Sequence, residues 1–379
     1  MAKDNNQPTL TEEQINAVAE LYNSGKFSET IAKIKALNED YPNVPLLFNI
    51  LGACYQAQGL LEDSAQMFET ATKIKPDYAE AYFNLGVVFK ADEKLDEAIE
   101  SYKKAIYLVP NYAAAHNNLG NIYKDINQID DAMKSYESAI AIKPDYSEAH
   151  FNLGNIYKKL GMLLKAELSF NESIKENPEY FDAHFNLGNT LRDLGQRNDA
   201  LKSYERAFEL KSNADYILGN VIHTKMHISK WKNLPTDINN LKNAINENKK
   251  VIGPFALSAL IDSPSIIRKA AEIYVFDKYP KNNLFPQIKN YPKDKKIRIG
   301  YFSGDFNQHP VSTLTAELYE VHNRDKFEIH AFSFGPDTKD ELNLRIKAGV
   351  DQFHDVESMS HMEIVNLARS LEIDIAVDL

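Results

Sequence analysis

Hydrophobic residues recur at helical spacing through the first two thirds of the chain, and residues 113–146 show the pattern clearly. There the apolar positions predict one amphipathic helix over AAAHNNLGNIYKDI (113–126) and a second over IDDAMKSYESAIAI (129–142). Pro144 follows the second helix, and proline ends a helix because it lacks an amide donor and clashes with the preceding turn. Each such unit is therefore predicted to be a pair of helices.

The same unit returns every 34 residues, and the heptapeptide NLGNIYK is written identically at 118–124 and 152–158. The repeated positions hold small residues, aromatic residues and prolines. They are Gly52, Gly86, Gly120, Gly154 and Gly188; Phe68, Tyr102, Tyr136, Phe170 and Tyr204; Ala98, Ala132, Ala166 and Ala200; and Pro42, Pro76, Pro110, Pro144 and Pro178. The small residues let the two helices approach closely. A 34-residue helix pair with this pattern resembles the tetratricopeptide repeat.

Six full units and one decayed unit follow one another along the chain. The full units span 11–44, 45–78, 79–112, 113–146, 147–180 and 181–214. The first has Val18 where later units have glycine, and the sixth has Ser212 where proline is expected. The letters LGN return at 218–220, only 31 residues after 187–189, which indicates a shortened seventh unit at the end of a solenoid. Residues 1–214 are therefore predicted to form a superhelix whose first helices line the concave side.

Asparagine occupies one position of four consecutive units, although it costs about 0.5 kcal/mol relative to alanine in a helix interior. This asparagine column consists of Asn84, Asn118, Asn152 and Asn186, each directly before Leu-Gly. A second column, Asn121, Asn155 and Asn189, lies three residues later on the same helical face. An asparagine amide can bind the N–H and C=O of one peptide unit, so the first column predicts a site for an extended polypeptide. The alternative, that these side chains bond neighbouring helices or face water, stays open for both columns.

Two other sets of reactive side chains are interpreted as structural. His116, His150 and His184 stand one repeat apart, whereas metal ligands cluster within one site. Tyr82 occupies the same position in the preceding unit, so these histidines are predicted to be packing residues. Cys54 falls on a helix beside small residues and is predicted to be buried and unreactive.

After residue 214 the 34-residue period fades. Residues 215–295 are predicted to hold the decayed repeat, helices over 215–231, 236–250 and 263–278, and an extended connector over the Pro-, Lys- and Asn-rich segment 276–296. From residue 296 the pattern changes to alternating strands and helices. Strands are predicted over 296–303, 326–334, 352–356 and 373–379, and helices over 312–322, 340–350 and 361–372. This alternation predicts a parallel, doubly wound sheet.

Such sheets bind their ligands beyond the carboxyl ends of the strands. The loop GDFNQHP leaves the first strand at that end, so Asp305 and His309 are placed for chemistry. The chain has no G-x-G-x-x-G, P-loop, H-E-x-x-H or G-x-S-x-G motif, and no D-x-D pair. The residues alone therefore define no reaction.

Composition excludes several classes of protein. A net charge of −11 argues against a general nucleic-acid binder, which needs a basic face. The apolar runs are far shorter than the roughly 18 residues of a membrane span. The polar start MAKDNNQPTL lacks the apolar core of a signal peptide, and a single cysteine fits a reducing compartment. The sequence thus predicts a cytoplasmic protein with polypeptide partners, and no nucleic acid or membrane.

The order of the segments resembles the O-linked N-acetylglucosamine transferase family, including its bacterial and plant relatives. The resemblance rests on repeats of the NLGNIYK kind, a connector with SKW (229–231) and the segment IRIGYFSGDFNQHPVSTL (297–314). It implies a mostly α fold, a tetratricopeptide-repeat superhelix followed over 296–379 by a partial α/β Rossmann-like domain, the N-terminal lobe of a GT-B enzyme. Two such lobes enclose the family's active site, so these 379 residues are expected to be an N-terminal part that is inactive alone.

By the same resemblance, the activity would be transfer of N-acetylglucosamine from UDP-GlcNAc to Ser or Thr of acceptor proteins, without a metal or other cofactor. His309 corresponds to the family's active-site histidine, and Asp378 approximates an acidic position. The asparagine column corresponds to a ladder that grips the acceptor backbone. Plant relatives of this arrangement transfer fucose from GDP-fucose, so the donor sugar stays open. A non-catalytic repeat scaffold is the alternative from a different class.

Overall fold

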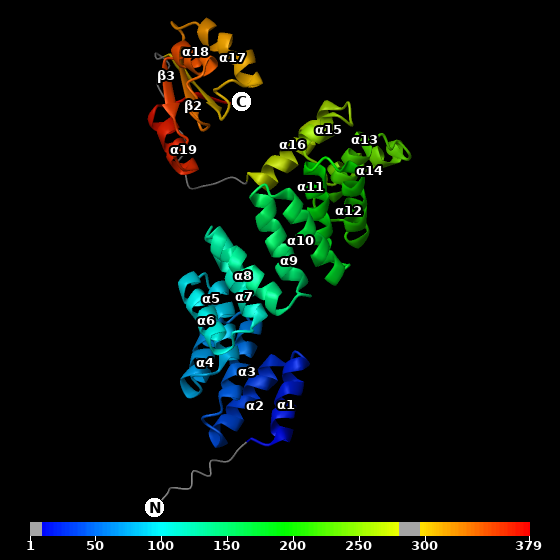
Figure 1. Ribbon diagram of the computed structural model, residues 1–379, viewed down its shortest axis with the longest axis vertical. Helices are drawn as coiled ribbons and strands as arrows, with labels where there is room; N and C mark the ends of the chain where they lie inside the picture. Colours follow the sequence, from blue (N-terminus) through cyan, green and yellow to red (C-terminus); the bar gives the residue numbers. More distant parts are fainter. Residues whose placement is uncertain (1–9, 280–295) are drawn as a thin grey trace, which may run out of the picture. The chain divides into compact units, whose positions relative to one another are not determined.

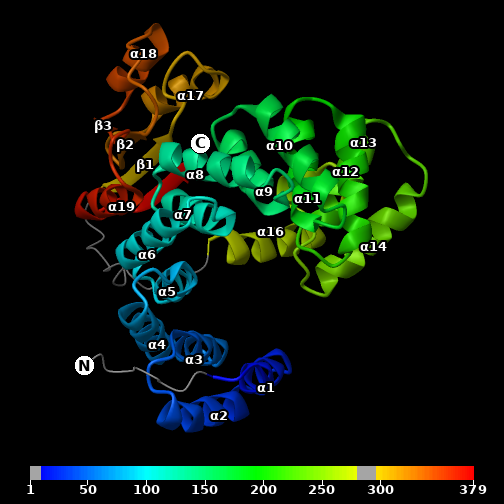
Figure 2. The same cartoon turned by 60° about the horizontal axis from the view of Figure 1, so that its bottom comes forward.

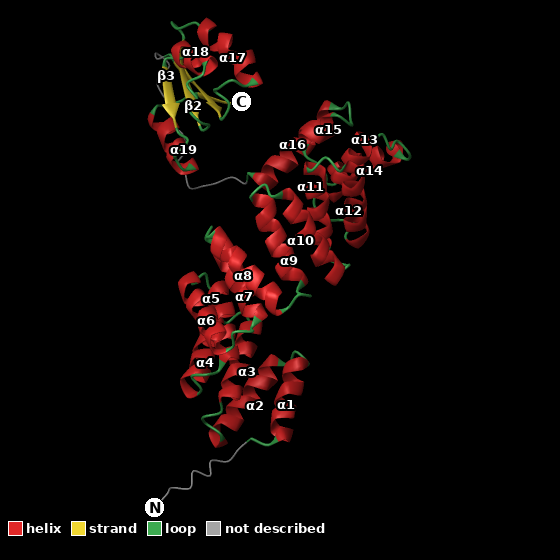
Figure 3. Ribbon diagram, in the orientation of Figure 1, coloured by secondary structure: helices red, strands yellow, loops and turns green. Residues whose placement is uncertain are grey.

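The computed structural model describes residues 10–279 and 296–379, which fall into two compact units, Met1–Lys281 and Asn282–Leu379. The described part of the first unit contains helices and no strand, and the four strands lie in the second unit (Figure 3). The predicted fold class, mostly helical with a small parallel sheet at the end, is confirmed. Most of the predicted connector 276–296 lies outside the described residues, and its first three residues belong to a helix that ends at Lys278.

The repeats fold as the helix pairs that the sequence predicts (Figures 1 and 2). The pairs are α1 Glu12–Asn23 with α2 Phe27–Asp40, α3 Pro45–Ala57 with α4 Leu61–Ile74, α5 Ala79–Ala91 with α6 Leu95–Leu108, α7 Ala113–Asp125 with α8 Ile129–Ile142, α9 Ser147–Lys159 with α10 Leu163–Glu176, and α11 Phe181–Asp193 with α12 Arg197–Leu210. Helix α8 ends two residues before Pro144, as the missing amide donor of proline requires. Each second helix from α4 to α10 packs on its own first helix and on the first helix of the next pair.

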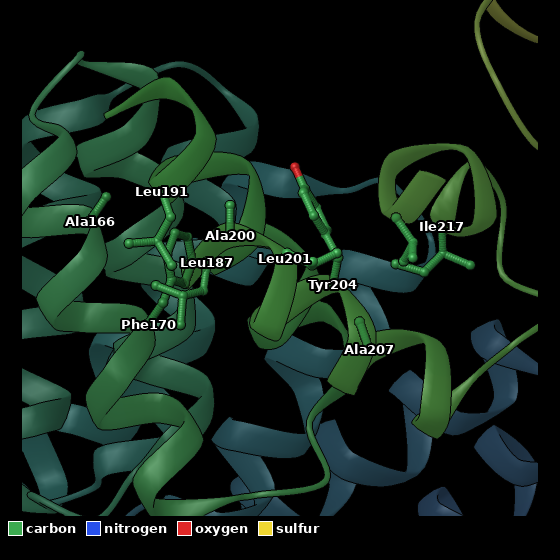
Figure 4. Packing of buried hydrophobic residues seen from close by; sticks show 10 residues of the cluster. Ala166, Phe170, Leu187, Leu191, Ala200, Leu201, Tyr204, Ala207 and Ile217 are labelled. Atoms are coloured by element: carbon green, nitrogen blue, oxygen red, sulfur yellow. The ribbon is translucent and has the colours of Figure 1, made fainter. Parts of the chain in front are cut away.

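The glycine column sets how closely the two helices of a pair approach. A Cβ atom added to Gly120 would lie 2.7 Å from the ring of Tyr136, and one added to Gly188 would lie 2.6 Å from the ring of Tyr204. Glycine therefore leaves the space that an aromatic ring of the second helix fills. Figure 4 shows Tyr204 with Leu187 and other buried side chains of this core. The prediction that small residues permit the close approach is confirmed.

Four helices follow the repeats: α13 Ile217–His227, α14 Leu234–Asn246, α15 Pro254–Ser258 and α16 Pro264–Lys278. The first ends four residues earlier than predicted, and α15 was not predicted, because one turn is too short to show a periodic pattern. In α13 a Cβ atom on Gly219 would lie 2.3 Å from the carbonyl oxygen of Val251. The glycine of this decayed unit therefore packs on a backbone segment after α14, and no longer on an aromatic ring.

The second unit is a four-stranded parallel sheet of order β3-β2-β1-β4. Its elements are β1 Ile297–Ser303, α17 Pro310–Val321, β2 Phe327–Ser333, α18 Glu341–Gly349, β3 Gln352–Asp355, α19 His361–Ser370 and β4 Ile375–Asp378. Helix α17 starts two residues before the predicted Ser312. Proline suits the first helical position, since its fixed φ is helical and the amide it lacks would have no partner there. His309 is consequently the N-cap residue of α17.

The two faces of this sheet are covered unequally. Ile299 and Ile329 point to the face where Tyr319 of α17 and Ile346 of α18 complete a buried core. On the other face the rings of Phe302 and Phe332 stack at a centroid distance of 4.4 Å. That face meets α19, which contributes no fully buried residue and leaves a hollow against the sheet.

Candidate functional site

The asparagine column lies where the first helices of adjacent repeats meet. Nδ2 of Asn84 donates to Oδ1 of Asn49 at 3.0 Å, and Nδ2 of Asn152 donates to Oδ1 of Asn117 at 3.1 Å. Each bond joins the first helices of two successive units. Asn152 is 8% exposed, whereas Asn84 is half-buried. These two amides therefore link neighbouring repeats.

The other two members of the column make different contacts. Nδ2 of Asn118 donates to the hydroxyl of Tyr102 at 3.3 Å, and Nδ2 of Asn186 donates to Oδ1 of Asn155 at 2.9 Å. All four side chains thus bond adjacent helices, which is the alternative that the sequence left open. Each amide still has a second donor hydrogen and an oxygen that these bonds do not use. Binding of a polypeptide by this column stays a prediction.

Partners in the second asparagine column depend on the aromatic residue of the same unit. The hydroxyl of Tyr136 donates to Oδ1 of Asn121 at 2.8 Å. The hydroxyl of Tyr204 donates to Asn189 in the same way, also at 2.8 Å. In the fifth unit the aromatic residue is phenylalanine, which has no hydroxyl, and the asparagine there accepts from the next repeat instead.

Successive repeat interfaces alternate in type, a feature that we did not predict from the 34-residue period. One position of the first helix reads Asn49, Phe83, Asn117 and Phe151 in four consecutive units. Nδ2 of Asn117 donates to Oε1 of Glu148 at 3.2 Å. The ring of Phe83 instead stacks on Tyr112 at a centroid distance of 4.9 Å. The alternation holds over these four units, with a period of 68 residues, and Phe185 in the sixth unit ends it.

The histidine column and the cysteine are structural, as predicted. Nε2 of each histidine donates to the carbonyl oxygen of the proline six residues earlier. The pairs are His116 with Pro110 at 3.1 Å, His150 with Pro144 at 2.8 Å and His184 with Pro178 at 3.0 Å. These bonds tie each first helix to the turn before it. Cys54 is fully buried, and burial raises the pKa of its thiol to about 11, so it stays protonated and unreactive near neutral pH.

In the second unit, the loop after β1 holds His309 at the carboxyl edge of the sheet. The ring of Phe306 is buried in the core under α17, and its carbonyl oxygen accepts a 2.7 Å bond from Nδ2 of Asn343. The amide of Gln308 donates to Oδ2 of Asp340 at 2.9 Å. Both anchoring side chains come from the start of α18, so two elements fix the loop that presents His309.

Nδ1 of His309 has two possible partners, and each implies a different state of the ring. The amide of Val311 donates to Nδ1 at 3.3 Å, which places the proton of a neutral ring on Nε2. Oδ2 of Asp305 lies 3.5 Å from the same nitrogen, and that contact favours a proton on Nδ1. The side chain of His309 is 42% exposed, so a ligand can reach the ring.

Asp378 lies at the end of β4, where it lines the hollow beside α19. This hollow has a volume of about 740 Å³ and is largely apolar, with Phe302, Phe334 and Ile364 among its lining residues. The structure gives no hydrogen bond or ion pair between Asp378 and His309. The two predicted catalytic residues therefore reach the same edge of the sheet but do not contact each other.

Two features are absent from the described residues, 10–279 and 296–379. No group of three or more His, Cys, Asp or Glu side chains in these ranges is arranged to hold a metal ion. None of their helices is long and apolar enough to cross a membrane. That the chain uses no metal stays a prediction.

Comparison with known proteins identifies both parts of the chain. Residues 52–93, 88–127 and 120–161 match the TPR repeat, residues 147–180 and 181–214 match the tetratricopeptide repeat, and residues 271–370 match glycosyl transferase family 41. A protein of Arabidopsis thaliana, described as a probable UDP-N-acetylglucosamine–peptide N-acetylglucosaminyltransferase SEC, is 33% identical over 85 residues. This stretch is 22% of the present chain and 9% of the plant protein.

Solved structures resemble the chain more weakly. A mutant O-GlcNAc transferase of Thermobaculum terrenum has a TM-score of 0.38 and 22% identity, over 70% of this chain and 45% of its own. The protein MamA has a TM-score of 0.40 and 25% identity, over 43% of this chain and 95% of its own. The sequence matches therefore establish the class: tetratricopeptide repeats followed by a glycosyl transferase family 41 region. The resemblance to the O-linked N-acetylglucosamine transferase family is confirmed.

Proposed function

We propose that the protein is an O-glycosyltransferase that transfers N-acetylglucosamine from UDP-GlcNAc to serine or threonine of acceptor polypeptides. One observation supports this most strongly: a glycosyl transferase family 41 region follows tetratricopeptide repeats in a single chain. The description of the Arabidopsis relative names the same donor sugar and a peptide acceptor. The repeats would hold the acceptor on the surface of the first helices, through the asparagine column.

The proposed transfer needs a group that handles the acceptor proton. The acceptor oxygen bonds to the anomeric carbon of the sugar, the bond from that carbon to the nucleotide phosphate breaks, and the hydroxyl proton leaves. With Nδ1–H directed at Asp305, Nε2 of His309 is free to accept that proton. With Nδ1 accepting from Val311, Nε2 instead donates a hydrogen bond to substrate. Both roles place His309 at the reacting atoms, and neither requires a metal or other cofactor.

Asp378 is the weaker of the two catalytic candidates. Its carboxylate lines the apolar hollow beside α19 and makes no bond to His309. At this position its proposed role is a contact with the nucleotide sugar.

We also propose a cytoplasmic location, because the single cysteine is buried and unpaired, which fits a reducing compartment.

The test is transfer by protein produced from the complete gene, with acceptor proteins and either UDP-GlcNAc or GDP-fucose. Mass spectrometry of the acceptors should detect N-acetylhexosamine on Ser or Thr with the first donor only. Transfer from GDP-fucose alone would replace the proposed donor with the second candidate. Binding of polypeptide without transfer from either donor would indicate a repeat scaffold.

A further inference from the structure

The first helices of the repeats carry opposite charges at the two ends of one face. In α9, Glu148, Asn152, Asn155 and Lys158 are spaced by four, three and three residues, so they lie along one side of the helix. The first and last are about 15 Å apart along the axis, at 1.5 Å per residue. This face of α9 therefore has a carboxylate at one end, two amides in the middle and an ammonium group at the other end.

Three more first helices follow the same order. Helix α11 has Asp182, Asn186, Asn189 and Arg192; helix α5 has Glu80, Asn84 and Lys90; and helix α7 has Asn118, Asn121 and Lys124, with Ala114 in the place of the acid. We call Glu80, Glu148 and Asp182 the acidic edge, and Lys90, Lys124, Lys158 and Arg192 the basic edge. The two asparagine columns run between the edges.

Helix macrodipoles alone do not account for the regularity of this order. A macrodipole favours cations in the last turn of any helix. The four first helices α5, α7, α9 and α11 all have a basic residue in the last turn. Among the second helices, α4 and α10 have one, whereas α2, α6, α8 and α12 have none. The basic last turn is thus regular only on these four consecutive first helices.

The acidic edge is held in place from the preceding repeat and carries negative potential. Nδ2 of Asn49 donates to Oε1 of Glu80 at 3.5 Å, and Glu148 accepts the equivalent bond two repeats later. Burial, followed by the charge of Glu80, raises the pKa of Tyr78 and Tyr112 beside this edge. Lys75 lies 5.0 Å from the ring centroid of Tyr78, so a cation of the chain is already attracted here.

The basic edge is partly exposed and only partly neutralised. The side chains of Lys90, Lys124 and Arg192 are 35%, 37% and 43% exposed. Lys158 is half-buried, and burial lowers the pKa of its ammonium group. Asp125 lies 3.8 Å from Lys90 and 3.6 Å from Lys124, and Asp193 lies 3.1 Å from Arg192. The four cations of this edge outnumber the two carboxylates beside them, on a chain whose net charge is −11.

We propose that the first-helix face selects extended polypeptides whose charges alternate along the chain, an inference that rests on the proposed function. In an extended chain the backbone N–H and C=O groups lie in the plane of the pleat, and successive side chains point to opposite sides of that plane. A backbone that bonds the asparagine columns therefore directs alternate side chains to the two edges. Lysine or arginine at one set of positions meets the acidic edge, and aspartate or glutamate at the other set meets the basic edge.

Fluorescence anisotropy with labelled 12-residue peptides tests this on the full chain. One peptide alternates Lys and Glu, a second has the same composition as Lys-Lys-Glu-Glu blocks, and a third contains only Ser and Gly. Central prolines keep the first two from forming helices. At low salt the alternating peptide should bind about five-fold tighter than the block peptide, as expected for two or three exposed ion pairs. Salt should remove the difference.

Variants assign the preference to the edges. The double variants Glu80→Gln with Glu148→Gln, and Lys124→Gln with Lys158→Gln, should each abolish the preference for the alternating peptide. Glu100→Gln with Lys134→Gln, on the exposed surfaces of α6 and α8, is the matched control and should leave it unchanged. Equal affinity of the alternating and block peptides overturns the inference. If the Ser-Gly peptide still binds in that case, the proposed function is not contradicted. Failure of all three peptides to bind overturns both.

Discussion

The hydroxyl of Tyr136 donates a 2.8 Å hydrogen bond to Oδ1 of Asn121, which lies 15 residues earlier on the first helix of the same repeat. The ring of Tyr136 fills the space that Gly120 leaves on the facing helix. Burial, with smaller contributions from Asp125 and Glu148, raises the pKa of Tyr136, so the hydroxyl stays protonated and donates at physiological pH. One side chain thus packs the helix pair and orients an amide of the first-helix face.

Replacing Tyr136 with phenylalanine removes the hydroxyl and keeps the ring. We expect Tyr136→Phe to lower the free energy of unfolding by about 0.5–1.5 kcal/mol, the usual net value of one hydrogen bond. Urea denaturation followed by circular dichroism measures this difference. Tyr107→Phe is the matched control, because Tyr107 is 77% exposed and should show no change. Equal stability of both variants would mean that the Asn121 bond contributes nothing.

Gly120→Ala separates helix propensity from packing. Alanine is favoured over glycine by about 1 kcal/mol in an exposed helix interior. Here the added Cβ would lie 2.7 Å from the Tyr136 ring, and overpacking of this kind costs about 1–3 kcal/mol. We therefore expect a lower melting temperature, against the direction of propensity. Asn171→Ala, at an exposed position of α10, is the control and should be neutral or slightly stabilising; a stabilised Gly120→Ala would contradict the packing argument.

The asparagine column can be tested with two kinds of variant. Asn118→Ala with Asn186→Ala changes half-buried amides and should weaken binding of the Ser-Gly peptide several-fold, with helicity unchanged. Asn152→Ala should in addition lower stability by about 1–3 kcal/mol, because buried Asn117 loses its donor. Isothermal calorimetry and urea denaturation measure the two effects. Unchanged peptide affinity in the double variant would show that the column only joins repeats.

His309 and Asp305 distinguish the two possible roles of the imidazole. In protein from the complete gene, His309→Ala should lower kcat by about 10²–10⁴ if the ring is a general base. Asp305→Asn should then lower kcat as well, since the carboxylate orients Nδ1–H. If Nε2 is instead a donor, Asp305→Asn should change kcat little, because the Val311 amide sets that tautomer. Normal turnover of His309→Ala, with unchanged stability, would remove the residue from the active site.

A pair of histidines should make the second unit sensitive to acid. Nδ1 of His330 on β2 lies 3.1 Å from Nε2 of His354 on β3, and His330 is 1% exposed. Burial lowers the pKa of both rings, and the charge of His330 lowers that of His354 further. For His330, the carboxylates of Glu328 and Asp351 oppose this shift.

The sign of the effect follows from these shifts. In the unfolded chain both histidines bind protons below about pH 6.5, whereas in the folded chain their lowered pKa keeps them neutral at that pH. The pair therefore contributes to the free energy of unfolding above about pH 6.5, and this contribution is lost as the pH falls. Amide protection factors of β2, which correct for intrinsic exchange, should fall between about pH 7.5 and 5.5. His354→Gln should reduce this pH dependence. Equal protection at both pH values would show that the pair does not destabilise the fold in acid.

Helix bounds in the repeats were predictable because they depend on local signals. The second helix of the fourth unit was predicted over 129–142 and lies at Ile129–Ile142. Turn residues and prolines recur at the same offsets, and apolar spacing identifies the buried face without knowledge of the neighbour. The single-turn helix α15 was missed for the same reason, since five residues contain too few apolar positions to define a period.

The sequence by itself determined which residue types recur, and hence the repeats, the order of strands and helices along the second unit, and the place of His309 after the first strand. Only the tertiary structure decided the partners. Asn155 accepts from Asn186 because Phe170 has no hydroxyl, whereas Asn121 accepts from a tyrosine. Such bonds join residues 15 to 35 positions apart on different helices, so they depend on how closely the helices pack. A local pattern carries no information on that distance, and the first-helix face is therefore defined by packing between repeats.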